Sequence, residues 1–129
     1  MQQSVAIAAV AVGGAIGSVL RYLISSWFVA RATSGFPWGT FAINVTGSLA
    51  IGVVLQLALS RSGLNPYVRL FLATGILGGY TTFSTYAFEV YNLGATAPPL
   101  QSVAYGLGSV VAGVVAAYAG TLLVRAFAA

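Results

Sequence analysis

The sequence lacks cysteine and histidine, and Glu89 is its only acidic residue among 129 positions. Metal-dependent hydrolysis, thiol chemistry and Ser-His-Asp catalysis depend on those side chains, so we do not expect an enzyme. The five basic residues are all arginines, and the net charge of +4 is spread thinly along the chain. Such a sparse positive charge predicts no nucleic-acid surface.

Charge of either sign is scarce, because charged residues make up only 5% of the chain, against about 25% in soluble domains. Hydrophobic residues make up 59%, and the mean hydropathy is +0.95. This composition predicts an all-α integral protein of the cell membrane, surrounded by the lipid bilayer. A membrane-spanning helix needs about 20 apolar residues, so residues 1–129 accommodate a single domain of four spans with short loops.

The hydrophobic pattern predicts membrane-spanning helices at about residues 4–28, 38–59, 70–91 and 101–123. The start, MQQSVAIAAV, lacks the basic region of a signal peptide, so the first span is expected to remain in the mature protein. Four short helices do not easily enclose a polar pathway. A pore built from this chain would therefore need an oligomer.

The distribution of arginines indicates how the chain is oriented in the membrane. Four spans place Arg61, Arg69 and Arg125 on one side, and Arg31 on the other, together with Arg21 if its side chain extends that way. The positive-inside rule reads such differences, and this one is small. The count permits insertion in both orientations and an antiparallel dimer, although it does not establish one.

The first span contains GGAIGSVLRY, residues 13–22. Gly13 and Gly17 are four residues apart, and so are Gly14 and Ser18. Small residues at this spacing let helix backbones approach closely. Arg21 follows among apolar residues, where a charged side chain is costly and is a functional candidate. The alternative, that Arg21 extends its head group to the membrane surface, carries equal weight.

Polar residues recur along one face of the second span. Thr40, Asn44 and Ser48 are four residues apart, and Gly47 adjoins them. An asparagine deep in a span needs a partner, which is another helix, water or a ligand. A single asparagine often only joins two helices, but a stripe of three polar residues favours a polar pathway.

The third span contains GILGGYTTFSTY, residues 75–86, where a plain apolar helix is expected. Glycine weakens a helix interior, and threonine is stiff and bonds to the backbone, so these residues predict a helix broken mid-membrane. Such breaks often bind ions through helix ends and free carbonyls. The alternative is a continuous helix whose glycines pack against a neighbour. The hydroxyl cluster, with Phe83 and Tyr86 three residues apart, favours an ion site.

Two further features carry open alternatives. Glu89 lies near the end of the third span, and we expect a solvated helix end rather than a contact with an arginine or a place in a vestibule. Ser102, Tyr105 and Ser109 share one face of the fourth span. This face either packs against another helix or extends a polar path.

Three motifs together carry a family resemblance: GGAIGSVLRY, then PWGTFAINVTG, then GILGGYTTFST. In this order and separation, within a four-span layout that covers the whole chain, the sequence resembles the Fluc-type fluoride channels, also called CrcB proteins. The resemblance implies a passive, fluoride-selective channel that exports fluoride from the cytoplasm across the bacterial inner membrane. It also implies an antiparallel, dual-topology homodimer with two pores along its interface.

The resemblance further implies a structural Na⁺ at the centre of the dimer, held by the backbone carbonyls of Gly78 and Thr81. Residues matched to the fluoride pathway are Arg21, Thr40, Asn44, Phe83, Ser84, Thr85, Tyr86, Tyr105 and Ser109. Two positions depart from the family pattern. Tyr86 replaces the usual second phenylalanine, and its hydroxyl is a potential ligand for the ion or water. Gly113 stands where a serine is often found, which puts the continuity of the polar track on the fourth span in doubt.

Two other functions compete with a channel. A small dual-topology exporter of cationic drugs also has four short helices, but it needs an acidic residue inside the membrane, and Glu89 is the only acid. A non-transporting membrane scaffold would use the glycines for helix packing alone. Neither alternative explains the polar stripe at Asn44 together with the Thr/Ser cluster.

Overall fold

A computed structural model describes residues 2–60 and 63–128, so Arg61 of the orientation count lies outside the described residues. The described residues form helices with short connections and no β-strand. The helices are α1 (Gln3–Arg31), α2 (Trp38–Leu59), α3 (Pro66–Arg69), the π-helix η1 (Leu70–Leu77), α4 (Gly78–Tyr80), α5 (Phe83–Thr96) and α6 (Pro99–Ala128).

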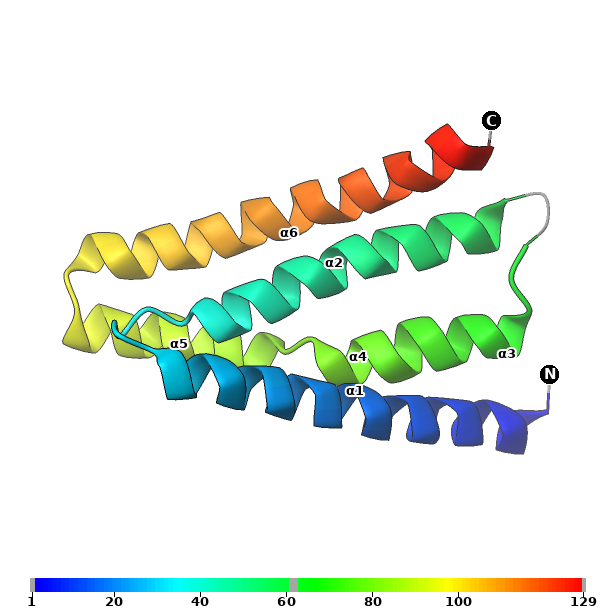
Figure 1. Ribbon diagram of the computed structural model, residues 1–129, viewed down its shortest axis with the longest axis horizontal. Coiled ribbons are helices and arrows are strands. Elements are labelled where there is room, and N and C mark those ends of the chain that lie inside the picture. The colour runs from blue at the N-terminus through cyan, green and yellow to red at the C-terminus, as the bar shows by residue number, and fades with distance from the viewer. Residues whose placement is uncertain (1, 61–62, 129) are drawn as a thin grey trace.

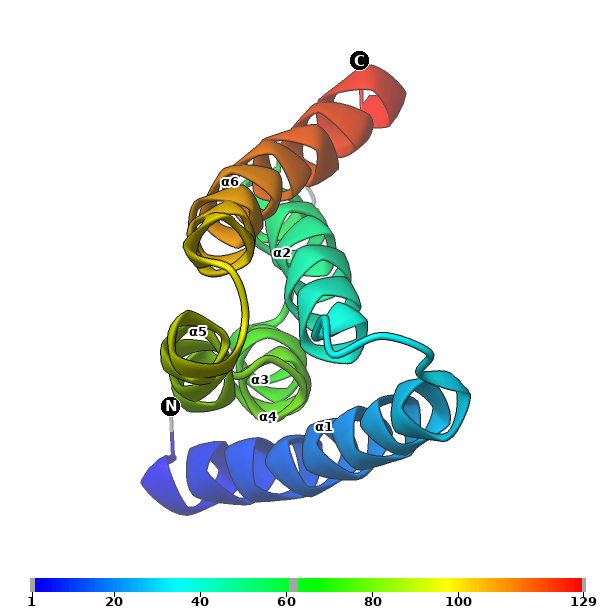
Figure 2. The same ribbon diagram turned by 90° about the vertical axis from the view of Figure 1, so that its left-hand side faces the viewer.

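The helices lie side by side as long rods (Figure 1). The chain reverses direction after α1, after α2 and after α5, and α3, η1, α4 and α5 follow one another along a single rod. The most extensive contacts join α2 to α6 and α1 to η1. Seen end-on, α1 and α6 lie at opposite margins, with α2 and the α3–α5 rod between them (Figure 2).

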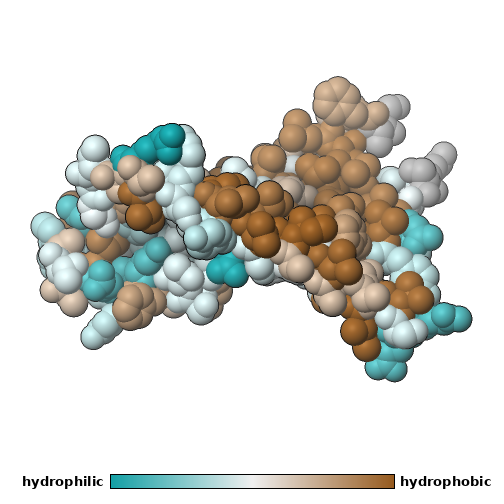
Figure 3. All heavy atoms as spheres, turned by 60° about the horizontal axis from the view of Figure 1, so that its bottom comes forward, coloured by the Kyte–Doolittle hydropathy of each residue, from teal (hydrophilic) through white to brown (hydrophobic). Residues whose placement is uncertain are grey.

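The outer surface is that of a membrane protein. Three of the described helices, α1, α2 and α6, are long and apolar enough to cross a membrane. Hydrophobic side chains run across the middle of the face in Figure 3, and hydrophilic ones gather toward its ends. Because burial in lipid replaces burial in a protein core, exposed leucines, valines and phenylalanines are expected on such a surface. The chain is a multi-pass membrane protein, as its composition predicts.

Glycines allow α1 to pack directly on the backbone of the α3–α5 rod, which is the third rod in chain order. Gly13 and Gly17 are the buried residues of α1. A methyl group on Gly17 would overlap the carbonyl of Ile76, and one on Gly79 would meet the Gly14 carbonyl at 2.5 Å. The small-residue spacing in the sequence therefore corresponds to close backbone contacts between α1 and the η1–α4 segment.

The helical backbone is interrupted between α4 and α5. Thr81 (φ −80°, ψ 158°) and Thr82 (φ −148°, ψ 120°) are extended, and a new helix begins at Phe83. The Thr82 hydroxyl caps this helix by accepting a hydrogen bond from the backbone N–H of Thr85 at 3.3 Å. The Thr81 hydroxyl donates to the Leu77 carbonyl at 2.9 Å, which stabilises the end of the preceding helix.

Candidate functional site

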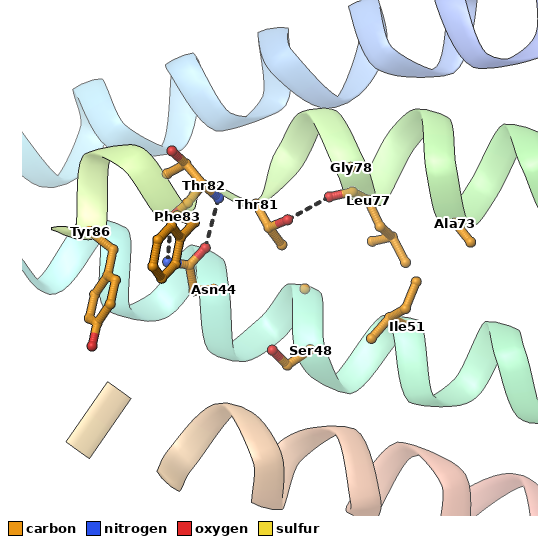
Figure 4. Close-up of a pocket in the computed structure, with 11 residues that line it drawn as sticks. Asn44, Ser48, Ile51, Ala73, Leu77, Gly78, Thr81, Thr82, Phe83 and Tyr86 are labelled. Carbon is orange, nitrogen blue, oxygen red and sulfur yellow. Dashed lines mark hydrogen bonds between the residues drawn. The ribbon is translucent and has the colours of Figure 1, made fainter. Parts of the chain in front are cut away.

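Asn44 on α2 pairs with the extended backbone at the interruption. Its side-chain amide donates to the Thr82 carbonyl at 3.0 Å and accepts from the Thr82 N–H at 2.9 Å (Figure 4). A primary amide offers both a donor and an acceptor, so one side chain satisfies both backbone groups of an extended residue. Asn44 thus holds the interruption in place, and this contact is the partner that a polar side chain in a span requires.

The interruption also frees backbone carbonyls. In a continuous helix the N–H of Thr82 would donate to the Gly78 carbonyl, but here it donates to Asn44. The N–H of Thr85 would donate to the Thr81 carbonyl, but here it donates to the Thr82 hydroxyl. Gly78 and Thr81 are the two residues whose carbonyls the family resemblance assigns to a cation.

Arg21 binds the same interruption from the side of α1. Its Nε donates to the Gly79 carbonyl at 3.0 Å, across 58 positions of sequence. A hydrogen bond from a charged donor is stronger than one between neutral groups, so Arg21 fixes the end of α4 against α1. The Nε of Arg21 is therefore engaged within the protein, whereas the sequence left open a functional role or a side chain that extends to the membrane surface.

A cavity of about 350 Å³ opens beside the interruption (Figure 4). Asn44 and Ser48 line it from α2, Gly78 from the start of α4, Thr81 from the extended segment after α4, and Phe83 and Tyr86 from α5. Phe83 is 78% exposed in the single chain. Donors from a helix face, free carbonyls and an aromatic ring therefore meet around one space.

Tyr86 is held on both sides of its ring. Its hydroxyl donates to the Gly106 carbonyl on α6 at 2.6 Å, and its ring centroid lies 5.8 Å from that of Phe83 and 5.5 Å from that of Tyr105. A phenol has a single proton to donate, and here that proton is used within the protein. The Tyr86 hydroxyl therefore joins α5 to α6. Its proton is not available for the ion or water, which the sequence left open as partners.

Glu89 is not the solvated helix end that we expected from the sequence, and that expectation is wrong. Its two carboxylate oxygens accept hydrogen bonds from Thr40 on α2 at 2.8 Å and from Tyr105 on α6 at 2.7 Å, in a partly buried setting. Tyr105 is 1% exposed and Thr40 is buried. The carboxylate accepts from hydroxyls on two helices at once, which is why it lies inward despite its charge.

A second cavity, of about 440 Å³, lies beside Thr40 and Glu89. Thr40, Thr85 and Glu89 line it together with Arg31, whose guanidinium lies 4.4 Å from the centre of the Trp27 ring. A third cavity, of about 340 Å³, lies between α2, α5 and α6. Asn44, Phe83, Tyr86 and Ser109 line it, and the buried Ser109 hydroxyl has no hydrogen-bond partner among the described residues.

The predicted site residues thus fall into neighbouring groups. The first and third cavities share Asn44, Phe83 and Tyr86, whereas Thr40 and Thr85 line the second. Arg21 approaches from α1 on the other side of the interruption, and Ser84 is exposed in the first turn of α5.

Sequence reasoning missed the structural roles of Thr82 and Glu89. A signal for Thr82 was its position three residues before Thr85, which is the spacing of a helix cap. The signal for Glu89 was its isolation, because a lone acid near a membrane span needs donors. Within the described residues no cluster of His, Cys, Asp or Glu is arranged to hold a metal ion. A cation at this site would therefore have to use neutral oxygens, such as those of backbone carbonyls, hydroxyls or the Asn44 amide.

The fold and site define a small multi-pass membrane protein whose helices bring hydroxyls, an amide and aromatic rings together around an interrupted segment. Residues 8–121 match the family model described as "CrcB-like protein, Camphor Resistance (CrcB)". The chain belongs to this family, which confirms the resemblance seen in its motifs.

Curated relatives are similar over most of their length. A protein of Rhizobium meliloti (strain 1021) is 44% identical over 91% of this chain and 94% of its own, and one of Nitrobacter winogradskyi is 48% identical over 92% and 94%. A protein of Chloroflexus aurantiacus (strain J-10-fl) is 46% identical over 94% and 96%. Each is named "Fluoride-specific ion channel FluC". The family is thus one of ion channels, and the chain is not an enzyme, as its composition predicts.

Proposed function

We propose that this chain is a passive, fluoride-selective channel whose pathway passes the interruption at Thr81 and Thr82. The observation that carries the proposal is the pairing of Asn44 with Thr82, which holds the interruption open beside a cavity lined by hydrogen-bond donors and Phe83. The names of the relatives support fluoride as the ion. The segment from α3 to α5 then forms the third span, and its break lies within the membrane.

Fluoride is small and strongly hydrated, so it enters such a pathway only where donors replace its water. The hydroxyls of Ser84, Thr85 and Ser109 and the amide of Asn44 offer donors, and the Arg21 guanidinium contributes positive charge. The hydroxyls of Thr40 and Tyr105 donate to Glu89 and would reach the ion only by leaving that carboxylate. The edge of an aromatic ring is positive, so the ring of Phe83, held against Tyr86, favours an anion that approaches its edge. Several weak sites in series allow the ion to leave as well as to enter.

We further propose that two copies assemble antiparallel, with two pores along their interface. Phe83 is 78% exposed in one chain although it lines the site, so a second copy would complete the wall around its ring. A twofold interface places the same surface of each copy against the other, which yields one pore per copy. The weak difference in arginine count supports insertion in both orientations.

A structural Na⁺ fits the residues at the centre of this assembly. The carbonyls of Gly78 and Thr81 lose their helical donors at the interruption, and carbonyl oxygens suit hard cations. Two oxygens from one chain are fewer than such a cation takes, and the second copy would double them. When bound, the ion supplies fixed positive charge near the anion path. We expect purified protein moved from Na⁺ into a bulky organic cation to unfold at lower temperature, as measured by a thermal melt.

Export follows from the chemistry of the ion. Hydrofluoric acid crosses membranes in its neutral form and ionises inside, and a negative-inside potential drives the trapped anion outward through a channel. The competing drug exporter needs an acid that exchanges protons with cations, whereas Glu89 is engaged by Thr40 and Tyr105. This arrangement favours the channel over the exporter.

The test is efflux from liposomes that contain the purified protein, followed with a fluoride electrode and a parallel chloride electrode. Rapid fluoride release with chloride retained is the expected result. Release of both ions at similar rates would argue against fluoride selectivity. No release from protein that elutes as a single folded species would leave the scaffold as the better explanation.

A further inference from the structure

The hydroxyl of Ser48 has no hydrogen-bond partner among the residues that the structure describes. It lies one helical turn after Asn44 on the same face of α2. Helical serine and threonine commonly donate to a carbonyl in the preceding turn, as Thr46 does to Ala42 at 2.7 Å. Among the described residues the Ser48 hydroxyl makes no such bond. Its donor is therefore free.

The free hydroxyl lies at the junction of two cavities. Ser48 lines the cavity beside the interruption and also the one between α2, α5 and α6, each time together with Asn44 and Phe83 (Figure 4). The second of these cavities also contains the buried hydroxyl of Ser109, which has no partner among the described residues. A buried hydroxyl without a partner is costly, so the Ser109 hydroxyl, with the unpaired hydroxyl of the partly exposed Ser48 on the same cavity, indicates a polar occupant.

Gly113 explains why the Ser48 hydroxyl has room. A side-chain carbon on Gly113 would lie 3.3 Å from the Ser48 Oγ, which is close contact. The hydroxyl on α2 thus occupies the space that a side chain at position 113 of α6 would enter. One turn before Gly113, Ser109 presents the preceding hydroxyl of that helix.

We propose that Ser48 is a further fluoride-binding residue, and that its hydroxyl on α2 supplies the donor that Gly113 on α6 cannot. The inference rests on the proposed channel function and extends its pathway from Asn44 toward Ser109. The two serines offer hydroxyl donors, which suit the small, strongly hydrated anion of the proposed channel. The doubt that Gly113 raised about a continuous polar track is thereby answered by a residue on a different helix.

The experiment moves the hydroxyl instead of only deleting it. Ser48→Ala removes the donor, and we expect fluoride efflux from liposomes to fall about tenfold, as for the loss of one hydrogen bond to a charged group. The double variant Ser48→Ala, Gly113→Ser restores a hydroxyl from the facing helix, and the alanine leaves space for it. We expect the double variant to regain most of the lost rate.

A matched control places the new hydroxyl elsewhere on α6. In Ser48→Ala, Gly108→Ser the added side chain meets no atom within 4 Å, and we expect no recovery. Gel filtration and a thermal melt of each variant verify that the proteins compared are equally folded.

The outcomes separate this inference from the channel itself. Efflux by Ser48→Ala at the wild-type rate would remove Ser48 from the pathway while the channel stands. A slow Ser48→Ala that neither double variant restores, or that both restore equally, would also overturn the inference, because the position of the hydroxyl would then not matter. Failure of the wild type to release fluoride would instead reject the proposed function.

Discussion

Residues 75–86 of the α3–α5 rod present two different sides to the rest of the molecule. Toward α1, Gly75 and Gly79 let backbone lie on backbone, and an added methyl group would collide with Gly13 or Gly14. Toward α2 and α6, the threonines and Phe83 face cavities, and polar groups are left open. The side toward α1 is closely packed because its glycines have no side chains. The side toward α2 and α6 borders cavities that polar side chains line.

This difference shows that close packing and an ion pathway are not competing explanations of the glycine-rich stretch. The glycines hold the rod firmly against α1, and Arg21 adds a hydrogen bond to the Gly79 carbonyl at 3.0 Å. A firmly held rod tolerates an interruption, because its freed backbone groups find Asn44 and the Thr82 hydroxyl. The packed side therefore supports the open side.

The largest effect is expected from crowding the packed side. Gly17→Ala places a methyl group on the Ile76 carbonyl, and we expect it to lower the free energy of unfolding by about 3 kcal/mol. The matched control is Gly14→Ala, whose methyl group meets no atom within 4 Å. Thermal melts in detergent compare the two variants. Equal stability would mean that the backbone contact at Gly17 does not hold the rod.

The next effect comes from the open side. In Asn44→Asp the carboxylate still accepts from the Thr82 N–H but no longer donates to the Thr82 carbonyl, and it adds negative charge to an anion path. We expect fluoride efflux to fall about a hundredfold, as for the loss of a strong interaction with a charged ion. Flux at the wild-type rate would remove Asn44 from the pore.

The matched control for this variant is Asn65→Asp. Among residues 2–60 and 63–128 the Asn65 side chain only accepts, from the Tyr67 N–H at 2.9 Å, and aspartate caps a helix as well as asparagine does. We expect Asn65→Asp to retain the fluoride efflux of the wild type, which would show that the loss at position 44 is specific to that site.

A smaller effect is expected at Glu89. The amide of Glu89→Gln keeps one oxygen for Thr40 or Tyr105 and loses the second acceptor, so we expect fluoride efflux to fall about fivefold. The same preparations are tested for uptake of a cationic dye driven by a proton gradient. Dye uptake that the wild type performs and Glu89→Gln abolishes would favour the drug exporter over the channel.

The smallest effect is expected from Tyr86→Phe, which introduces the residue that the family resemblance implies at this position. The hydrogen bond to the Gly106 carbonyl is lost, and the free energy of unfolding should fall by about 1 kcal/mol. The preference for fluoride over chloride should not change, because the ring remains. Tyr118→Phe, at an exposed position of α6, is the control for stability. A changed ion preference in Tyr86→Phe would mean that the hydroxyl contacts the ion.

Much of this arrangement could be predicted from local sequence. Long apolar runs predict a membrane protein because hydrocarbon excludes charge, and the four-residue spacing of Gly13 and Gly17 predicts close helix contact. The residues of the GILGGYTTFSTY stretch predict weak helical structure where Thr81 and Thr82 are extended. The depth of that interruption in a membrane, the Na⁺ and the antiparallel dimer stay predictions.

The partners of the polar side chains could not be predicted, because they depend on tertiary contacts. Glu89 finds Thr40 and Tyr105 at separations of 49 and 16 residues, and no local pattern pairs them. The same holds for the Tyr86 hydroxyl and Gly106, 20 residues apart. Sequence spacing shows which residues share a face, but only the packing of α5 against α6 shows what that face meets.

The most direct test of the central claim is a current recording from the purified protein in a planar bilayer, with unequal fluoride and equal chloride on the two sides. The account predicts a current that reverses at the equilibrium potential of fluoride, and loss of that current in Asn44→Asp. A current that reverses at zero voltage, where chloride is at equilibrium, would contradict a fluoride-selective pathway beside the interruption.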